Sequence, residues 1–444
     1  MPLAGVLALA SPAASQLAGA HFRNAGSNPA SYTAVTPPVL GATYTATIDL
    51  GGTTGHNLAW LAGYATPFTF TLGGGQTLLI NAGDPNGELL GQAFVPGPVA
   101  TYDLSVPADP AFAGFEVATQ ALHWGGVQPW ALSNAQDFIL GLAPGAPGEM
   151  ALVPGGECEM GDHHGEGNSD ELPVHTVYID PFWIDVYEVT NQKYADYLNT
   201  ALAQGRITVS SSVVYQVGGA GQALCDTTGS SIWSRITWNG STFGVTAGKE
   251  DHPMVRVSWY GACTYANQKS RDGGLTPCYD ETSWACDFGA GGYRLPTEAE
   301  WEKAARGGEY TPYYRYPWGD SIDGSKANYS SSGDPYETGS TPWTTPVGYY
   351  DGSQVPPGVD MANGWGLYDM AGNVWEWSND WYSYTYYSSS PYDNPTGPTT
   401  GMSRMVRGGG WAYDPWYLRS ATRDNRYPVG RSYTVGIRVL AVGH

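Results

Sequence analysis

The stretch GLYDMAGNVWEW, residues 366–377, is the most informative part of this 444-residue chain. Its two acidic residues, Asp369 and Glu376, lie on either side of a Gly-Asn pair, a dipeptide typical of tight turns. A second distinctive stretch, RGGGWAYDPWYLRSATR, follows at residues 407–423. The strongest signals for fold and function therefore lie in the last fifth of the chain.

The overall composition favours a loop-rich protein that binds neither nucleic acid nor membranes. The 60 glycines and 32 prolines indicate many turns, and the 31 tyrosines and 17 tryptophans provide aromatic side chains for packing and for a contact surface. A net charge of −21 disfavours nucleic acid and anionic membranes as partners. The sequence has no run of 18 apolar residues, so we expect no membrane span.

The cysteines and the first residues suggest an oxidising, extracellular location. Cys278 and Cys286 flank YDETSWA, a hairpin-like segment, and we expect a disulfide between them. Cys225 has no partner that the sequence identifies. Residues 1–22 resemble a secretory signal without a positive start, because the first basic residue is Arg23. We therefore expect a secreted protein.

A change in composition divides the chain into two domains. Residues 1–145 contain one basic and seven acidic residues, whereas the rest contains 19 and 34. The sequence LAPGAPG favours a linker over residues 144–149. In residues 23–143, short β-favouring runs alternate with Gly/Pro turns, which predicts an all-β sandwich; the runs are 43–50, 68–72, 76–82, 100–106 and 115–124.

The second domain, residues 150–444, is predicted to be α+β with few helices and many loops. Thr190 and Ser258 mark the starts of two helices, ending near Leu202 and Gly273. A capping box from Thr297 to Glu300 begins a third helix, and Gly307 ends it. Residues 207–249 look like an insertion, which we expect to form surface loops.

Eight motifs in this domain, in the same order, resemble the formylglycine-generating-enzyme (sulfatase-modifying factor) family, whose domain has a C-type-lectin-like fold. They are MALVPGGECEMGD, DVYEVTNQKYADY, HPMVRVSWYGA, YRLPTEAEWEKAARGG, YPWGD, GLYDMAGNVWEW, RGGGW and GIRVL. The resemblance covers about 290 residues, the whole second domain. It implies that this fold follows the β-sandwich.

The resemblance also implies calcium as the cofactor. The ligands would be side-chain oxygens of Asp369 and Glu376 and backbone carbonyls of Gly372 and Val374, which suit a hard cation. The alternative is that Asp369 caps a turn while Glu376 pairs with an arginine. A second family calcium site would involve Asn328 and Tyr329.

The catalytic residues of the family do not carry over. Its oxidase binds copper through two cysteine thiolates, and those positions hold Tyr413 and Leu418 here. Because all five cysteines precede residue 290, no thiolate pair is expected there, and we expect no catalytic residues. The polar stretch HHGEGNSDE, residues 163–171, is either an exposed loop or a metal site.

Arginine and aromatic residues are concentrated near the C-terminus. We expect the seven arginines between residues 404 and 438 to join loops through buried carboxylate pairs; an anion-binding patch is the alternative. Aromatic side chains there suit a contact surface for protein or glycan. The candidate binding residues are Trp381, Tyr382, Tyr384, Tyr386, Trp411, Tyr413, Trp416 and Tyr417.

The leading hypothesis is a secreted, non-catalytic member of this fold, stabilised by calcium. It would bind a protein or glycan, or assemble with copies of itself into an extracellular structure. Two alternatives remain open. One is a metal-dependent oxidoreductase with altered ligands, and the other is a ligand-display scaffold whose C-terminal loop is diversified.

Overall fold

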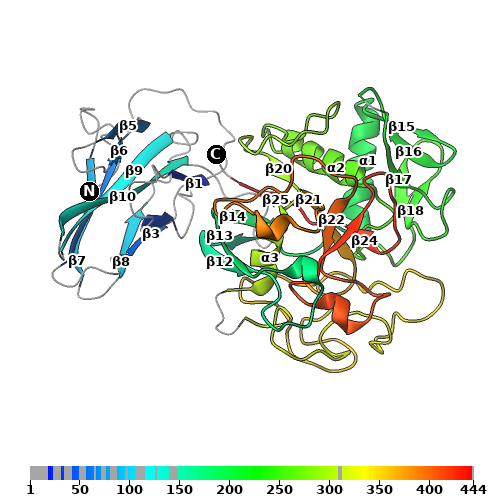
Figure 1. Cartoon of the computed structure of the whole chain (residues 1–444). Coiled ribbons are helices and arrows are strands. Elements are labelled where there is room, and N and C mark those ends of the chain that lie inside the picture. Colours follow the sequence, from blue (N-terminus) through cyan, green and yellow to red (C-terminus); the bar gives the residue numbers. More distant parts are fainter. Residues whose placement is uncertain are drawn as a thin grey trace.

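The computed structural model describes strands β1–β10 between residues 19 and 139, and residues 149–219, 221–308 and 313–442. Figure 1 shows the arrangement of the elements. Among the described residues, no helix is both long enough and apolar enough to cross a membrane. The strands before residue 140 and those after residue 149 share no sheet in the described parts of the chain.

The first part of the chain is all-β and antiparallel, as the sequence predicts. One sheet has the order β1-β10-β9-β4-β7, a second has the order β2-β3-β8, and β5 pairs with β6. The strands are β1 Gly19–Arg23, β2 Tyr32–Ala34, β3 Thr43–Asp49, β4 Asn57–Tyr64, β5 Pro67–Thr71, β6 Thr77–Ile80, β7 Glu88–Val95, β8 Val99–Ser105, β9 Glu116–Gly125 and β10 Gln128–Ile139.

The five strand runs predicted from sequence all correspond to strands, but the predicted start of this domain needs correction. Gly19 pairs with Ile139 and Phe22 with Gln136, so β1 includes four residues assigned above to a signal-like segment. Residues 1–18 and the predicted linker up to residue 148 lie outside the described residues. The β-rich part therefore begins by residue 19.

Three α-helices lie in the described residues of the second part, and each begins where the sequence predicts. In α1 (Asn191–Ala203) the Thr190 hydroxyl accepts a hydrogen bond from the Lys193 amide, and in α2 (Trp259–Asp272) Ser258 caps Gly261 in the same way. α3 (Glu298–Arg306) has the full capping box of Thr297 and Glu300, and Gly307 ends it in the left-handed conformation.

Short strands surround these helices in two four-stranded sheets and several hairpins. One sheet has the order β11-β14-β25-β20, and the other, β23-β22-β21-β24, contains a parallel pair between β21 and β24. The strands outside residues 207–249 are β11 Met150–Val153, β12 Gly156–Met160, β13 His175–Ile179, β14 Phe182–Asp185, β20 Tyr293–Arg294, β21 Trp375–Trp381, β22 Arg404–Arg407, β23 Asp424–Arg426, β24 Val435–Gly436 and β25 Leu440–Ala441. The α+β architecture with few helices is confirmed.

Residues 207–249 do not form surface loops alone, contrary to the prediction. They contain a three-stranded sheet, β15-β16-β17, and a hairpin, β18-β19. The strands are β15 Ile207–Ser210, β16 Val213–Gln216, β17 Ala223–Asp226, β18 Ile236–Trp238 and β19 Phe243–Val245. Val214, Leu224 and Ile236 are fully buried and join the core around α1 and α2, so hydrophobic burial orders this segment.

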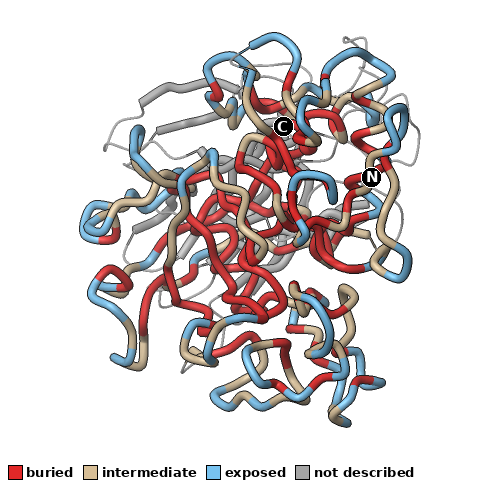
Figure 2. The backbone as a smooth tube through the Cα atoms, turned by 90° about the vertical axis from the view of Figure 1, so that its right-hand side faces the viewer, coloured by how far each residue is buried: buried red, intermediate tan, exposed pale blue. Residues whose placement is uncertain are grey.

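The core of the second part has two main apolar clusters. One lies around α1 and α2, and the other joins α3 to β12, β13 and β14. Trp259, Trp301, Trp375 and Trp377 are almost completely buried. Figure 2 shows buried backbone through the centre and exposed loops at the margins, so the long loops are anchored by a tryptophan-rich interior.

Candidate functional site

The predicted calcium ligands lie on the turn that leads into β21. Asp369 has a φ of 58°, and its Oδ2 accepts a hydrogen bond of 2.6 Å from the Gly348 amide. Glu376 is fully buried, and its carboxylate pairs with Arg438 at 2.8 Å and accepts a 2.6 Å bond from the Trp301 indole. The alternative interpretation of both side chains therefore matches the observed contacts.

A third buried carboxylate, which the sequence analysis missed, lies beside these two. Glu188 accepts hydrogen bonds from the Asn373 side chain at 2.7 Å and from the Val374 amide at 3.2 Å. It lies just after β14, almost two hundred residues from Asp369 in sequence. No local pattern connects two positions so far apart, so only the fold brings them together.

The electrostatics of this group show an excess of negative charge. Arg438 is the only basic side chain that forms an ion pair with Glu188, Asp369 or Glu376 among the described residues. Burial, reinforced by Glu376, raises the pKa of Asp369 to about 6. Burial and the neighbouring Asp369 and Glu376 raise the pKa of Glu188 well above its usual range. A cation near Asp369 would relieve this repulsion.

Asn328, predicted for a second calcium site, is also buried. Its side-chain amide donates to the Trp343 carbonyl at 2.8 Å, while its Oδ1 has no hydrogen-bond partner in the described part of the chain. Tyr329 is half-buried and packs against an apolar cluster. An unpaired buried oxygen is costly, and a cation would satisfy it.

Tyr413 and Leu418 are held firmly by their surroundings. The Tyr413 hydroxyl accepts a 2.9 Å hydrogen bond from Arg426, and its ring contacts those of Trp375 and Tyr417 edge-on. Leu418 is fully buried in an apolar cluster with Tyr316, Ala327 and Ala371. The two positions thus hold a phenol and an alkyl group where the family resemblance requires thiolates.

The cysteines themselves lie elsewhere and favour the protonated thiol. Burial raises the pKa of Cys278 to about 11 and that of Cys286 to about 12, and it raises the pKa values of Cys225 and Cys263 as well. Because the thiolate is the nucleophile and the metal ligand, these groups are poorly suited to either role.

The predicted Cys278–Cys286 disulfide is not formed in the structure, where both thiols are free. Tyr279, not Cys278, lies opposite Cys286 in an antiparallel bridge. Residues directly opposite share a face and their sequence neighbours point the other way, so this register places the two thiols on different faces. Cys278 instead contacts the Ala290 carbonyl at 3.6 Å.

The eight predicted binding aromatics do not form one exposed surface. Trp411 is buried, 5% exposed, between Trp343 and Tyr433, which corrects its assignment to a contact surface. Tyr384 (55%) and Tyr417 (36%) are the exposed members of the set, and the others are half-buried. Tyr427, at 63%, is more exposed than any of them, and the sequence analysis missed it.

Several of these half-buried rings have structural partners. The Tyr382 hydroxyl donates to Asp170 at 2.8 Å, and Tyr386 accepts a bond from the Gly397 amide. Trp381 at the end of β21 and Trp259 at the start of α2 hold the Arg404 guanidinium between them, 3.6 and 3.8 Å from the ring centres. This cation–π arrangement joins a sheet to a helix.

The other C-terminal arginines mostly form ion pairs, as predicted. Arg407 pairs with Glu302 at 2.5 Å, Arg423 with Glu298 at 2.6 Å, and Arg419 with Glu171 at 2.8 Å, all of them buried. Arg306 also pairs with Glu302. Burial alone would raise the pKa of Glu302, but Arg306 and Arg407 hold it at about 2.

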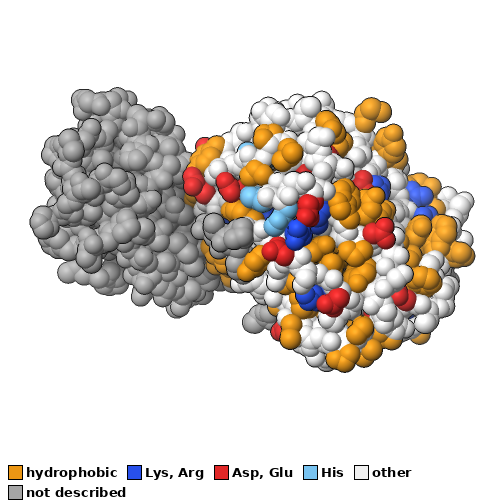
Figure 3. All heavy atoms as spheres, turned by 60° about the horizontal axis from the view of Figure 1, so that its bottom comes forward, with side chains coloured by type: hydrophobic (Ala, Val, Ile, Leu, Met, Phe, Trp, Pro, Cys, Tyr) orange, Lys and Arg blue, Asp and Glu red, His pale blue; other side chains and the backbone are white. Residues whose placement is uncertain are grey.

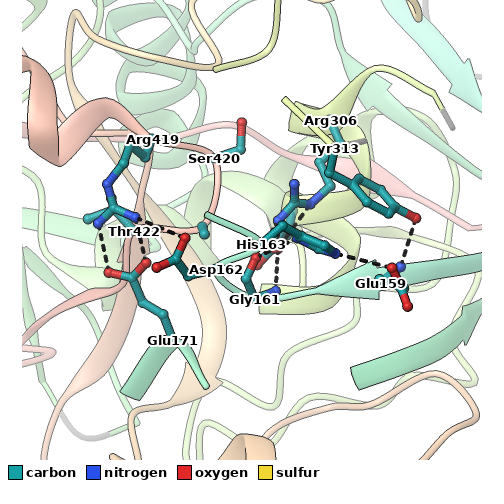
Figure 4. Close-up of polar contacts among 12 residues, drawn as sticks. Glu159, Gly161, Asp162, His163, Glu171, Arg306, Tyr313, Arg419, Ser420 and Thr422 are labelled. Carbon is teal, nitrogen blue, oxygen red and sulfur yellow. Dashed lines mark hydrogen bonds and ion pairs between the residues drawn. The ribbon is translucent and has the colours of Figure 1, made fainter. Parts of the chain in front are cut away.

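The histidine-rich segment 163–171 is a loop tied to the C-terminal segment (Figure 4). His163 stacks on Tyr313 and its Nε2 lies 3.2 Å from Glu159, while Glu171 binds Arg419. On the face in Figure 3, histidine, acidic and basic side chains gather in one patch. In the described residues, no group of three or more His, Cys, Asp or Glu side chains could hold a metal ion.

Comparisons with known proteins agree with this fold. Residues 143–442 match the family model described as "Sulfatase-modifying factor enzyme 1-like domain". The formylglycine-generating enzyme of Streptomyces coelicolor is 37% identical over 307 residues, which cover 64% of this chain and 87% of that enzyme. The Chlamydia trachomatis serine/threonine-protein kinase Pkn1 is 36% identical over 292 residues, which cover 65% of this chain.

The chain spans only 38% of the length of that Chlamydia protein. Among solved structures, Treponema denticola variable protein 1 aligns with a TM-score of 0.45 and 24% identity, covering 66% of this chain and 94% of that protein. The family model covers about two thirds of the chain. The chain therefore belongs to the sulfatase-modifying factor enzyme 1-like, or formylglycine-generating-enzyme, family.

Proposed function

We propose that this chain is a non-catalytic member of its family that is secreted and works as a binding or extracellular structural component. The observation that carries this proposal is the occupation of the two thiolate positions by Tyr413 and Leu418. A phenol bound to Arg426 and a fully buried alkyl side chain offer copper(I) no soft ligands. A protein or glycan, or further copies of the chain, would be the partner.

Calcium is the cofactor that we propose for this function. Asp369 would be its carboxylate ligand, with backbone carbonyls of the Gly372–Val374 turn beside it, while Glu376 remains bound to Arg438. The excess negative charge of Glu188, Asp369 and Glu376 supports the proposal, as does the unpaired Oδ1 of Asn328 at the second position. Calcium would stabilise the loops and supply no chemistry.

The catalytic part of the proposal is tested with a sulfatase peptide that contains the target cysteine. The chain is incubated with this peptide and copper, and the peptide mass is measured. We expect no change in mass, and conversion of the cysteine to an aldehyde would refute the proposal. The Streptomyces coelicolor relative, named as a formylglycine-generating enzyme, serves as the positive control.

The binding part is tested separately, with the full chain as the probe. Glycan arrays and sedimentation at increasing protein concentration distinguish a sugar ligand from self-association. Tyr384→Ala and Tyr427→Ala remove exposed rings that have no core partner, so the folded chain should lose its ligand and keep its melting temperature. A chain that stays monomeric and binds no glycan would favour a protein ligand, and pull-down would then identify it.

A further inference from the structure

A pocket of about 270 Å³ lies between α1 and α2, away from the residues discussed above. Figure 1 shows these two helices side by side. Each contributes one face with the same spacing: positions 193, 196, 197 and 200 on α1, and 265, 268, 269 and 272 on α2. Residues at i, i+3, i+4 and i+7 share a helix face, so two matching faces form the walls of this pocket.

Two tyrosine rings form its apolar base. Tyr197 and Tyr265 are 7% and 6% exposed, and their rings meet edge-on with centres 5.6 Å apart. The Tyr197 hydroxyl donates to Thr264 at 2.8 Å, which fixes its ring. The face of a tyrosine ring carries negative potential and attracts cations.

The charged side chains around the pocket leave a surplus of carboxylate. Lys269 pairs with Asp185 at 2.9 Å and Lys193 with Glu149 at 3.6 Å, so both lysines have acidic partners. Asp196 and Asp272 also line the pocket, and neither has a basic partner among the described residues. Their printed contacts are single hydrogen bonds, from the side-chain amides of Gln192 and Gln268.

A buried acceptor lines the same pocket. Gln268 is 1% exposed, and its Nε2 donates to Asp272 Oδ1 at 2.8 Å. That bond fixes which end of the amide is the oxygen, since a carboxylate accepts only from the nitrogen. The oxygen, Oε1, is buried and has no hydrogen-bond partner in the described part of the chain. An unpaired buried acceptor of this kind favours a ligand that brings N–H donors.

We propose that this pocket binds a positively charged nitrogen group, an alkylammonium or guanidinium. Asp196 and Asp272 supply the negative charge, Gln268 supplies an acceptor, and Tyr197 with Tyr265 supplies a base that attracts cations. The volume suits one such group with a short alkyl stem. The group belongs either to a lysine or arginine side chain of a partner protein or to a free polyamine.

This inference goes beyond the proposed function and does not depend on it. The pocket contains neither the Asp369 group nor Tyr413, so calcium removal or a test of oxidase activity says nothing about it. Conversely, failure of cation binding here would leave the non-catalytic proposal intact. The two proposals can therefore be tested on the same protein with separate outcomes.

The experiment titrates the full chain with spermidine and, separately, with N-acetyl-lysine amide at physiological salt, by calorimetry. Lysine acetylated on its ε-nitrogen is the neutral control ligand. Asp196→Asn and Asp272→Asn each remove one carboxylate with little change in shape, and we expect binding about tenfold weaker in each. Preference for one ligand over the other distinguishes a polyamine from a protein side chain.

Asp251→Asn is the matched control variant, since Asp251 is an exposed acid outside the pocket. Its affinity should equal that of the original chain. Equal weakening by all three substitutions would mean diffuse attraction to a protein of net charge −21 and would overturn the proposal. Absence of binding by both cations, or equal binding of the acetylated ligand, would overturn it as well.

Discussion

Two groups of buried carboxylates in this protein differ in how their charge is balanced. Around α3, the carboxylates of Glu298, Glu300 and Glu302 meet the guanidiniums of Arg423, Arg294, Arg306 and Arg407. Around β21, Glu188, Asp369 and Glu376 share one guanidinium, that of Arg438. The first group is complete within the chain, whereas the second needs a cation or a proton from outside.

The pKa values express this difference. Burial alone raises the pKa of any carboxyl group, yet the arginines around α3 hold the pKa of Glu302 at about 2. Without enough positive charge nearby, burial raises the pKa of Asp369 to about 6. Equal burial thus produces a permanent charge in one place and a titratable one in the other.

Breaking the balanced group should have the largest effect. Glu302→Ala leaves the guanidiniums of Arg306 and Arg407 buried without their partner, which costs about 3–5 kcal/mol of unfolding free energy. Urea unfolding followed by tryptophan fluorescence measures it. Arg315→Ala breaks the exposed pair with Glu166 and is the control, with a far smaller change expected. Similar losses in both variants would contradict this account of α3.

Supplying or withholding calcium tests the unbalanced group. At a calcium concentration about 100 times its dissociation constant, binding adds about 2.7 kcal/mol to the unfolding free energy, and a chelator removes it. Asp369→Asn should abolish this gain, because it removes the ligand. In chelator the same variant should be at least as stable as the original chain, since it also removes a buried charge. Melting curves of both proteins give all four values.

A buried base without an acidic partner extends the comparison to the opposite charge. His252 is 2% exposed and lies 3.4 Å from the Lys249 ammonium, and burial, with Lys249, lowers its pKa to about 3. In the unfolded chain the pKa is about 6.5. Its contribution is therefore present above pH 6.5 and is lost as the pH falls, by about 1.4 kcal/mol per pH unit between those values.

Denaturant unfolding at several pH values tests this effect of His252. His252→Gln cannot take up the proton, so its stability should fall less steeply below pH 6.5. Parallel pH profiles for the two proteins would exclude His252 as the cause. The carboxylates add their own acid dependence at lower pH, which both proteins share.

The smallest expected effect is at the start of α3. Thr297→Ala removes the hydroxyl that accepts from the Glu300 amide and should cost about 1 kcal/mol. Thr228→Ala, at an exposed threonine, is the control and should change little. A loss as large as that of Glu302→Ala would mean that the cap, and not the ion pairs, holds the balanced group together.

Local signals in the sequence predicted the local features of the structure. Thr190, Ser258 and Thr297 each mark a helix start because capping depends on residues within one turn. The eight ordered motifs identified the family for the same reason. Residues 207–249 failed as a prediction because their strands are only three or four residues long, and burial against α1 and α2 orders them.

Contacts between distant positions were harder to predict. The pair of Glu376 with Arg438 spans 62 residues, and the approach of Glu188 to Asn373 spans 185. Trp411 looked like a binding residue until Trp343 and Tyr433 covered it. The faces of α1 and α2 that line the pocket can be read from spacing, but their juxtaposition cannot.

The Arg404 clamp has a different kind of durability from the ion pairs. Two indole rings cannot take up a proton in the range where carboxylates do, so the attraction between Trp259, Arg404 and Trp381 persists in acid. Acidification that neutralises every aspartate and glutamate would still leave α2 fastened to the end of β21. That junction is the natural last refuge of tertiary order as the rest of the domain lets go.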